Sequence, residues 1–171
     1  MNKRTQLITT SALLISLSMV FLYLSTFFPT MQLCFVAAAS LFVVAQVIES
    51  GLAGGTFVFV GSCILGFIIV PDKTSVILYA LFFGYYPIVK SFAERYDNVI
   101  VRWVIKLIVM NAALAVILIF FGELIFAMSE FEYGLWVFVA LFELAFILFD
   151  IGVTRLIGFY MVRIHKKNRK F

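Results

Sequence analysis

The sequence predicts an all-α integral membrane protein, a bundle of six transmembrane helices with both termini in the cytoplasm. Three observations predict it: 64% of the 171 residues are hydrophobic, only 13% are charged, and the basic residues gather at the ends of long apolar segments. An average soluble domain has about 25% charged residues. A soluble domain of this size does not have a core large enough to bury so much apolar surface. We therefore expect one transmembrane domain over residues 1–171 and no soluble domain.

Breaks in the apolar pattern divide the chain into spans of about 20 residues, enough to cross a bilayer core of about 30 Å. Pro29 ends the first segment, residues 49–51 separate the second from the third, and residues 71–73 end the third. The first segment is longer than the apolar stretch of a signal peptide, so it is counted as a span. The expected spans cover about residues 6–28, 31–48, 52–70, 74–92, 99–121 and 134–162.

The distribution of Lys and Arg predicts the orientation, because positively charged connections remain in the cytoplasm. One set of alternate connections has only Lys73. The other set and the two tails hold all the remaining basic residues: Lys3, Arg4, Lys90, Arg95, Arg102, Lys106, Arg155, Arg163, Lys166, Lys167, Arg169 and Lys170. An even number of spans in the plasma membrane, with both ends inside, satisfies this distribution.

Charged residues within the spans are costly in lipid and need a partner or a polar cavity. Glu143 and Asp150 are seven residues apart, so they share one face of the sixth segment. If segments five and six are antiparallel, Lys106 or Arg102 reaches the level of Asp150, and we expect an intramembrane ion pair that is either structural or functional. Glu143 has no cation at its level, which indicates either a polar cavity or a protonated carboxyl hydrogen-bonded within the bundle.

Two further patterns are compatible with packing or with partner contact. Ala12 and Ser16 have the spacing of small residues that let transmembrane helices approach closely. Pro87 removes a backbone donor, so a kink is expected in the fourth segment near Phe83. The neighbouring Tyr85 and Tyr86 fit an interfacial aromatic belt, or alternatively a hinge or partner contact.

The residues that enzymes use for chemistry are not assembled in this sequence. No nucleophile, metal set or phosphate-binding loop accompanies the two intramembrane carboxylates, and Cys34 and Cys63 lie inside apolar runs without metal-ligand spacing. The net charge of +4 follows membrane topology and does not indicate nucleic-acid binding. We therefore expect no enzymatic activity, no cofactor and no nucleic-acid partner.

The layout resembles the substrate-binding S components of energy-coupling factor transporters, small six-helix proteins with both termini in the cytoplasm. The resemblance covers the whole chain and depends on Ala12 and Ser16 in the first span, the Pro29 break, the glycine-rich third span and polar residues in spans four to six. It implies that Ala12 and Ser16 contact a transmembrane coupling subunit. It also implies capture of a small micronutrient on the external side, with a pair of partner ATPases driving the protein to topple in the bilayer.

The resemblance places the ligand toward the external side, among the later helices and loops. The residues whose depth fits that position are Tyr79, Asn111, Glu123, Trp136 and Glu143. The competing interpretation is a membrane scaffold that needs no ligand, resembling the MreD group of cell-shape or sporulation proteins. A closed external pocket favours transport, whereas a filled bundle with a bare partner groove favours scaffolding.

Overall fold

The computed structural model describes residues 3–128 and 134–160, with the side chains of residues 5–116, 118–119, 139–140 and 142–159. Most of these residues are helical, and none of them forms a strand. The chain forms two compact units, residues 1–120 and 121–171. The prediction of one domain over the whole chain therefore remains a prediction.

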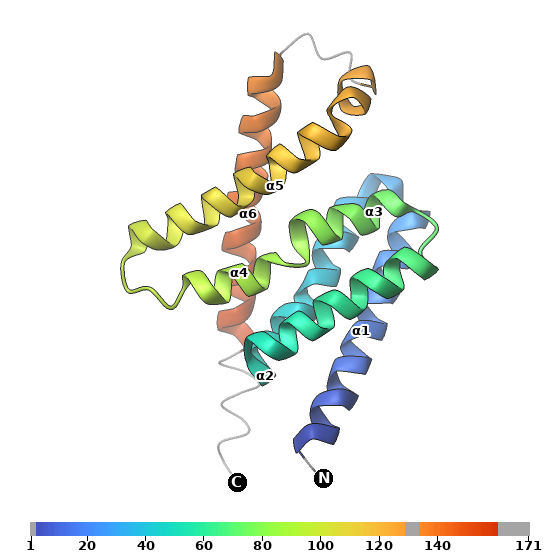
Figure 1. Ribbon diagram of the computed structural model, residues 1–171, viewed down its shortest axis with the longest axis vertical. Coiled ribbons are helices and arrows are strands. Elements are labelled where there is room, and N and C mark those ends of the chain that lie inside the picture. Colours follow the sequence, from blue (N-terminus) through green and yellow to red (C-terminus); the bar gives the residue numbers. More distant parts are fainter. Residues whose placement is uncertain (1–2, 129–133, 161–171) are drawn as a thin grey trace. The chain divides into compact units, whose positions relative to one another are not determined.

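The elements overlap the predicted segments, but one 38-residue helix covers the second and the third (Figure 1), so the count of six spans remains a prediction. In chain order they are α1 Lys3–Phe27, a 3₁₀ turn η1 Pro29–Met31, α2 Gln32–Ile69, α3 Lys73–Leu78, a π-helical turn η2 Tyr79–Phe83, α4 Tyr86–Ala93, α5 Val99–Met128 and α6 Gly134–Tyr160. In the described part of the chain, four segments are long and apolar enough to cross a membrane: Thr5–Phe27, Pro29–Ile69, Lys73–Ala93 and Val99–Val116. The membrane character predicted from composition is thus supported by helix length.

Gly51 divides the 38-residue helix α2 into two parts. Its backbone angles, φ 76° and ψ −172°, are not helical, and the chain reverses direction there (Figure 1). Residues with a Cβ avoid these angles, so glycine is the residue that permits this turn. The break expected at residues 49–51 is therefore present, although the helix is otherwise continuous on both sides of it.

The first helix packs against α2 through a stripe of small and apolar side chains. Ser11, Ile15, Ser18, Leu22 and Ser25 are buried and recur at helical spacing. Oγ of Ser18 donates a hydrogen bond of 3.3 Å to the carbonyl of Ala39 in α2. Because small side chains let helix backbones approach, this stripe brings the ends of α1 and α2 into register.

The segment after the 71–73 connection is a broken helix. A π-helical turn follows α3, where the Gly84 amide donates a 2.7 Å hydrogen bond to the carbonyl of Tyr79, and α4 starts afresh at Tyr86 with Pro87 in its first turn. A Cβ on Gly84 would lie 2.8 Å from the Phe59 ring, so a side chain does not fit at this bend. The kink expected near Phe83 is confirmed.

Candidate functional site

The connection between α2 and α3 caps both helices with opposite charges. Asp72 is the N-cap of α3: its Oδ1 accepts from the Thr74 amide at 3.1 Å and its Oδ2 accepts from the Ser75 amide at 3.2 Å. The Lys73 ammonium turns the other way and donates to the carbonyls of Phe67 at 2.6 Å and Val70 at 2.7 Å. Each charge complements the helix end that it contacts, so the short connection is held in one conformation.

A network of hydrogen bonds joins this connection to the first one. Nε2 of Gln32, the first residue of α2, donates to Oδ2 of Asp72 at 2.7 Å and to Oγ of Ser75 at 2.8 Å. Oγ of Ser75 donates to Oδ2 of Asp72 at 2.6 Å, and Oγ of Ser25 near the end of α1 lies 2.7 Å from Oγ of Ser75. Side chains from three helices are therefore tied together at this end of the unit.

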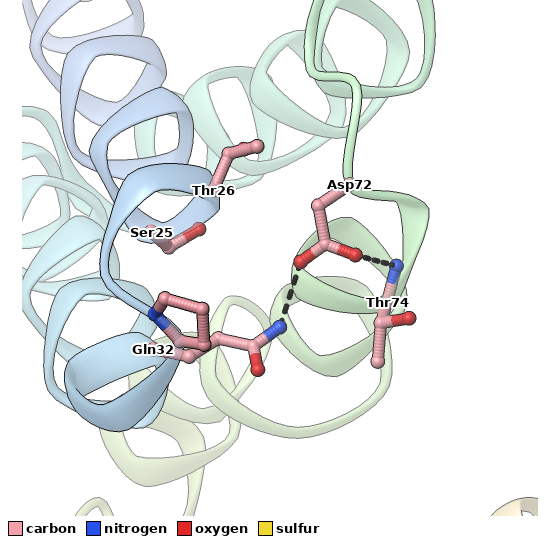
Figure 2. A pocket seen from close by; sticks show the side chains of 6 residues that line it. Ser25, Thr26, Gln32, Asp72 and Thr74 are labelled. Carbon is pink, nitrogen blue, oxygen red and sulfur yellow. Dashed lines mark hydrogen bonds between the residues drawn. The ribbon is translucent and has the colours of Figure 1, made fainter.

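A pocket of about 250 Å³ opens beside the network (Figure 2). Its lining consists of Ser25, Thr26, Pro29, Gln32, Asp72 and Thr74. In Figure 2 the Asp72 carboxylate lies between Gln32 and Thr74, bonded to both. The Thr26 hydroxyl is buried and has no hydrogen-bond partner among the described residues. An unpaired buried hydroxyl costs free energy, so it is available to a bound molecule or water.

Asp72 gives the pocket a negative charge. Burial alone raises the pKa of this carboxyl, but the hydrogen bonds from Ser75 and Thr74 outweigh burial and lower its pKa below the ordinary value of 3.8. None of the lining residues is basic, and Lys73 is bonded to backbone carbonyls. The carboxylate is therefore ionised at neutral pH, without a cationic side chain in the pocket.

The side chains around the pocket are suited to binding. They offer acceptors, hydroxyls and one charge, which are the groups that orient a small polar molecule in a pocket of this size. In the described ranges no group of three or more His, Cys, Asp or Glu side chains is placed to hold a metal ion.

Three of the residues predicted to bind a ligand, Tyr79, Asn111 and Glu143, are not among the described residues that line this pocket. Tyr79 is fully buried in the core of the first unit, where its hydroxyl has no hydrogen-bond partner among the described residues. Asn111 is exposed on α5, and its amide donates to the Leu107 carbonyl of the same helix at 3.0 Å. Glu143 is half-buried on α6 in the second unit. Each of the three therefore remains a prediction as a ligand contact.

Two further predicted ligand contacts fall in the part of the chain whose side chains are not described. The backbones of Glu123 and Trp136 belong to α5 and α6, whereas their side chains lie outside the described residues. Their proposed role is therefore also still a prediction.

One of the predicted intramembrane charges, Lys106, lies beside a carboxylate that the sequence analysis did not consider, that of Glu94. Nζ of Lys106 lies 3.7 Å from Oε1 of Glu94, and Nζ of Lys90 lies 3.2 Å from the same oxygen. Both lysines are almost completely buried. The Glu94 carboxylate therefore holds the end of α4 against α5 within the first unit.

The other residues of the predicted ion pair are Arg102 and Asp150. Nε of Arg102 is buried without a hydrogen-bond partner among the described residues, and Asp150 is buried on α6. A pair between Lys106 and Asp150 would join the two units, so it remains a prediction.

The small residues predicted to contact a partner lie on the exposed side of α1. Ala12 and Ser16 are both exposed in the first unit, and Oγ of Ser16 donates to the Ala12 carbonyl at 2.9 Å. Because the Ser16 hydroxyl is hydrogen-bonded within its own helix, it does not require a hydrogen bond to water. The neighbouring Ser11 and Ser18 are buried against α2, so the small residues of α1 divide between two faces.

Sequence reasoning did not find the pocket, although part of its signal is visible. Asp72 directly follows Pro71 and precedes Thr74 and Ser75, a pattern typical of a helix N-terminus. Ser25 and Gln32 flank the Pro29 break at the same predicted depth. Polar residues on both sides of two adjacent connections indicate a shared polar site once those connections are placed at one membrane surface.

Comparison of the chain with known protein families, with curated proteins and with solved structures yields no match.

Proposed function

We propose that the protein captures a small polar molecule at the external membrane surface, as the substrate-binding subunit of a micronutrient uptake transporter whose partner subunits hydrolyse ATP. The observation that carries the proposal is the polar pocket where α1, α2 and α3 meet. The pocket is open and not closed, but it is partly polar and of a size that suits a small metabolite, and a network of hydrogen bonds lies beside it.

The proposal includes six spans with both termini in the cytoplasm. The turn at Gly51 lets α2 supply two spans, since 38 residues extend about 57 Å and a bilayer core is about 30 Å thick. Lys90 and Arg95 lie at the far end of the broken helix from the pocket. By the preference of basic residues for the cytoplasm, the pocket then faces outside.

The exposed pair Ala12 and Ser16 supports contact with a transmembrane coupling subunit. A close helix contact in lipid needs small side chains on the outer side of the helix, and these two residues provide it. Transport by this arrangement requires the partner ATPases, because the proposed role of this chain is capture.

The test is to purify the tagged full-length protein from its native membrane in gentle detergent and to identify co-purifying proteins and released metabolites by mass spectrometry. The wild type is compared with Thr74→Trp, which fills the pocket from an exposed lining position, and with Thr56→Trp, at an exposed position of α2 outside the pocket. We expect a coupling subunit, paired ATPases and one enriched small molecule with the wild type and Thr56→Trp, and loss of the small molecule with Thr74→Trp.

Recovery of envelope or cytoskeletal proteins without an ATPase, and of the same metabolites from all three variants, would contradict capture. That result would favour the scaffold function of the MreD-like type, in which the outer side of α1 contacts a structural partner.

A further inference from the structure

The hydrogen-bond donors around the pocket are largely used by the protein itself. Oδ2 of Asp72 accepts from the Gln32 amide, the Ser75 hydroxyl and the Ser75 backbone amide. Oδ1 accepts a hydrogen bond of 3.1 Å from the Thr74 amide. A carboxylate oxygen has two lone pairs, so Oδ1 retains a position for one further donor.

Gln32 adds no free hydrogen-bond donor to the pocket. Nε2 is the donor in both of its side-chain hydrogen bonds, to Asp72 and to Ser75. The carboxylate fixes this orientation because it cannot accept from the amide oxygen. Oε1 of Gln32 therefore points away from Asp72, as Figure 2 shows, and has no donor among the described residues.

The groups left over in the pocket are thus mainly acceptors. They are Oδ1 of Asp72 and the Thr26 hydroxyl, which accepts as well as donates. A ligand that matches them carries several N–H or O–H donors. A carboxylate or phosphate ligand would bring further acceptors to a site that already lacks donors.

Charge narrows the class of ligand further. The ionised Asp72 has no basic side chain beside it in the pocket lining, and Lys73 is bonded to the carbonyls of Phe67 and Val70. A cation entering the pocket gains from the carboxylate, whereas an anion is repelled by it. A bare metal ion fits less well, because Ca²⁺ takes six to eight oxygen ligands and the lining offers a single carboxylate.

From this geometry we propose that the pocket binds a small organic ammonium ion, with an N–H group donating to the Asp72 carboxylate. A volume of about 250 Å³ accommodates an ammonium group together with a short polar carbon chain. The inference deepens the proposed capture function and rests on it for the biological use of the pocket, whereas the binding preference itself is measurable on the isolated protein.

The test compares three probes of nearly equal size on the full-length protein in nanodiscs: ethanolamine, ethylene glycol and glycolate, which are cationic, neutral and anionic. Binding is measured by saturation-transfer NMR at neutral pH. We expect binding of ethanolamine to the wild type, and weaker binding of choline, which keeps the charge and lacks N–H donors. Glycolate should not bind.

Asp72→Asn removes the charge while keeping a good helix cap, and Asp97→Asn, at an exposed position outside the pocket, is the matched control. Ethanolamine binding should weaken about tenfold or more in Asp72→Asn and remain unchanged in Asp97→Asn. Thr74→Trp retains the carboxylate and fills the space, so it should abolish binding as well.

Equal binding of glycolate or ethylene glycol, unchanged ethanolamine binding by Asp72→Asn, or no binding of ethanolamine to the wild type would each overturn the ammonium assignment. The proposed function fails separately, when the native-membrane purification yields no pocket-dependent metabolite. A pocket-dependent metabolite without a cationic group would leave capture intact and refute only its ligand class.

Discussion

Nε2 of Gln32 donates a 2.7 Å hydrogen bond to Oδ2 of Asp72, joining the first residue of α2 to the N-cap of α3. These residues are 40 positions apart in the sequence. The start of α2 and the connection that follows its end therefore lie next to each other. This agrees with the reversal of the chain direction at Gly51.

Gln32→Ala should loosen this end of the unit. The substitution removes two hydrogen bonds, one of them to a charged group, and we expect a loss of about 1 kcal/mol because the site is partly open to water. The measurement is thermal unfolding of the purified protein in detergent. Gln6→Ala, at an exposed position of α1, is the control and should leave the melting temperature unchanged. Equal effects of the two substitutions would show that the Gln32 bond contributes nothing.

Acid should weaken the same contact. Burial raises the pKa of Asp72, but the hydrogen bonds from Ser75 and Thr74 lower it further, so the folded protein has a pKa below the ordinary 3.8. A lowered folded pKa stabilises the protein fully above pH 3.8, and this contribution is lost as the pH falls through the folded value.

The melting temperature of the wild type should therefore fall toward that of Asp72→Asn as the pH decreases from about 5 to below 3.8. Asparagine caps the helix without titrating, so the difference between the two proteins isolates the charge. A difference that stays constant over this range would contradict the lowered pKa.

The helices were largely predictable from the sequence because their ends depend on local chemistry. Pro29, Gly51, Pro71 and Pro87 each mark a break or kink that is observed. The pocket was missed because it depends on contacts between segments far apart in the chain. Gln32 and Asp72 meet only after α1 and both halves of α2 have packed, and hydropathy does not encode that register.

The charged residues illustrate the same limit. The sequence indicated that Lys106 needs a partner and favoured Asp150, a pair that stays a prediction, and it did not consider Glu94, which lies 3.7 Å from Nζ of Lys106. Glu94 follows the last residue of α4, and the short connection to α5 brings it back beside Lys106. A count of spans predicts the depth of residues within the helices, but it does not predict the position of a side chain, such as that of Glu94, that follows a helix end.

Gly51→Ala should destabilise the turn within α2. A Cβ at this position would meet no atom within 4 Å, so the cost arises from the backbone alone, with φ at 76°. We expect a loss of about 1–3 kcal/mol, measured by thermal unfolding. Gly152→Ala in α6 also meets no atom within 4 Å but has helical backbone, and it should be neutral or stabilising. Equal effects at both positions would contradict a special role for the Gly51 conformation.

Tyr79→Phe tests whether the buried Tyr79 hydroxyl is structural or functional. The hydroxyl has no hydrogen-bond partner among the described residues, and the buried Ser62 hydroxyl also has none. Removing an unpaired buried hydroxyl should leave the melting temperature unchanged or raise it. Ser25→Ala is the contrast, because the Ser25 hydroxyl bonds to the Leu22 carbonyl at 2.6 Å and its loss should cost about 1 kcal/mol. A fall in the melting temperature with Tyr79→Phe would show that the hydroxyl has a partner such as a bound water.

The outer side of α1 offers the most direct test of a partner subunit. Ala12 and Ser16 are exposed, and Ser16 bonds only within its own helix, so the pair Ala12→Leu and Ser16→Leu should leave the melting temperature unchanged. Added bulk would separate two closely packed helices by more than the width of a methyl group, so we expect a transmembrane partner to be lost from the purified complex.

Ile64→Phe, which adds bulk at an exposed position of α2, is the control and should retain the partner. If the double substitution retains the partner and Ile64→Phe loses it, the contact lies on α2. Partner loss together with a lower melting temperature would instead show that Ala12 and Ser16 pack within the protein itself, since a purely intermolecular contact contributes nothing to the stability of the separated chain.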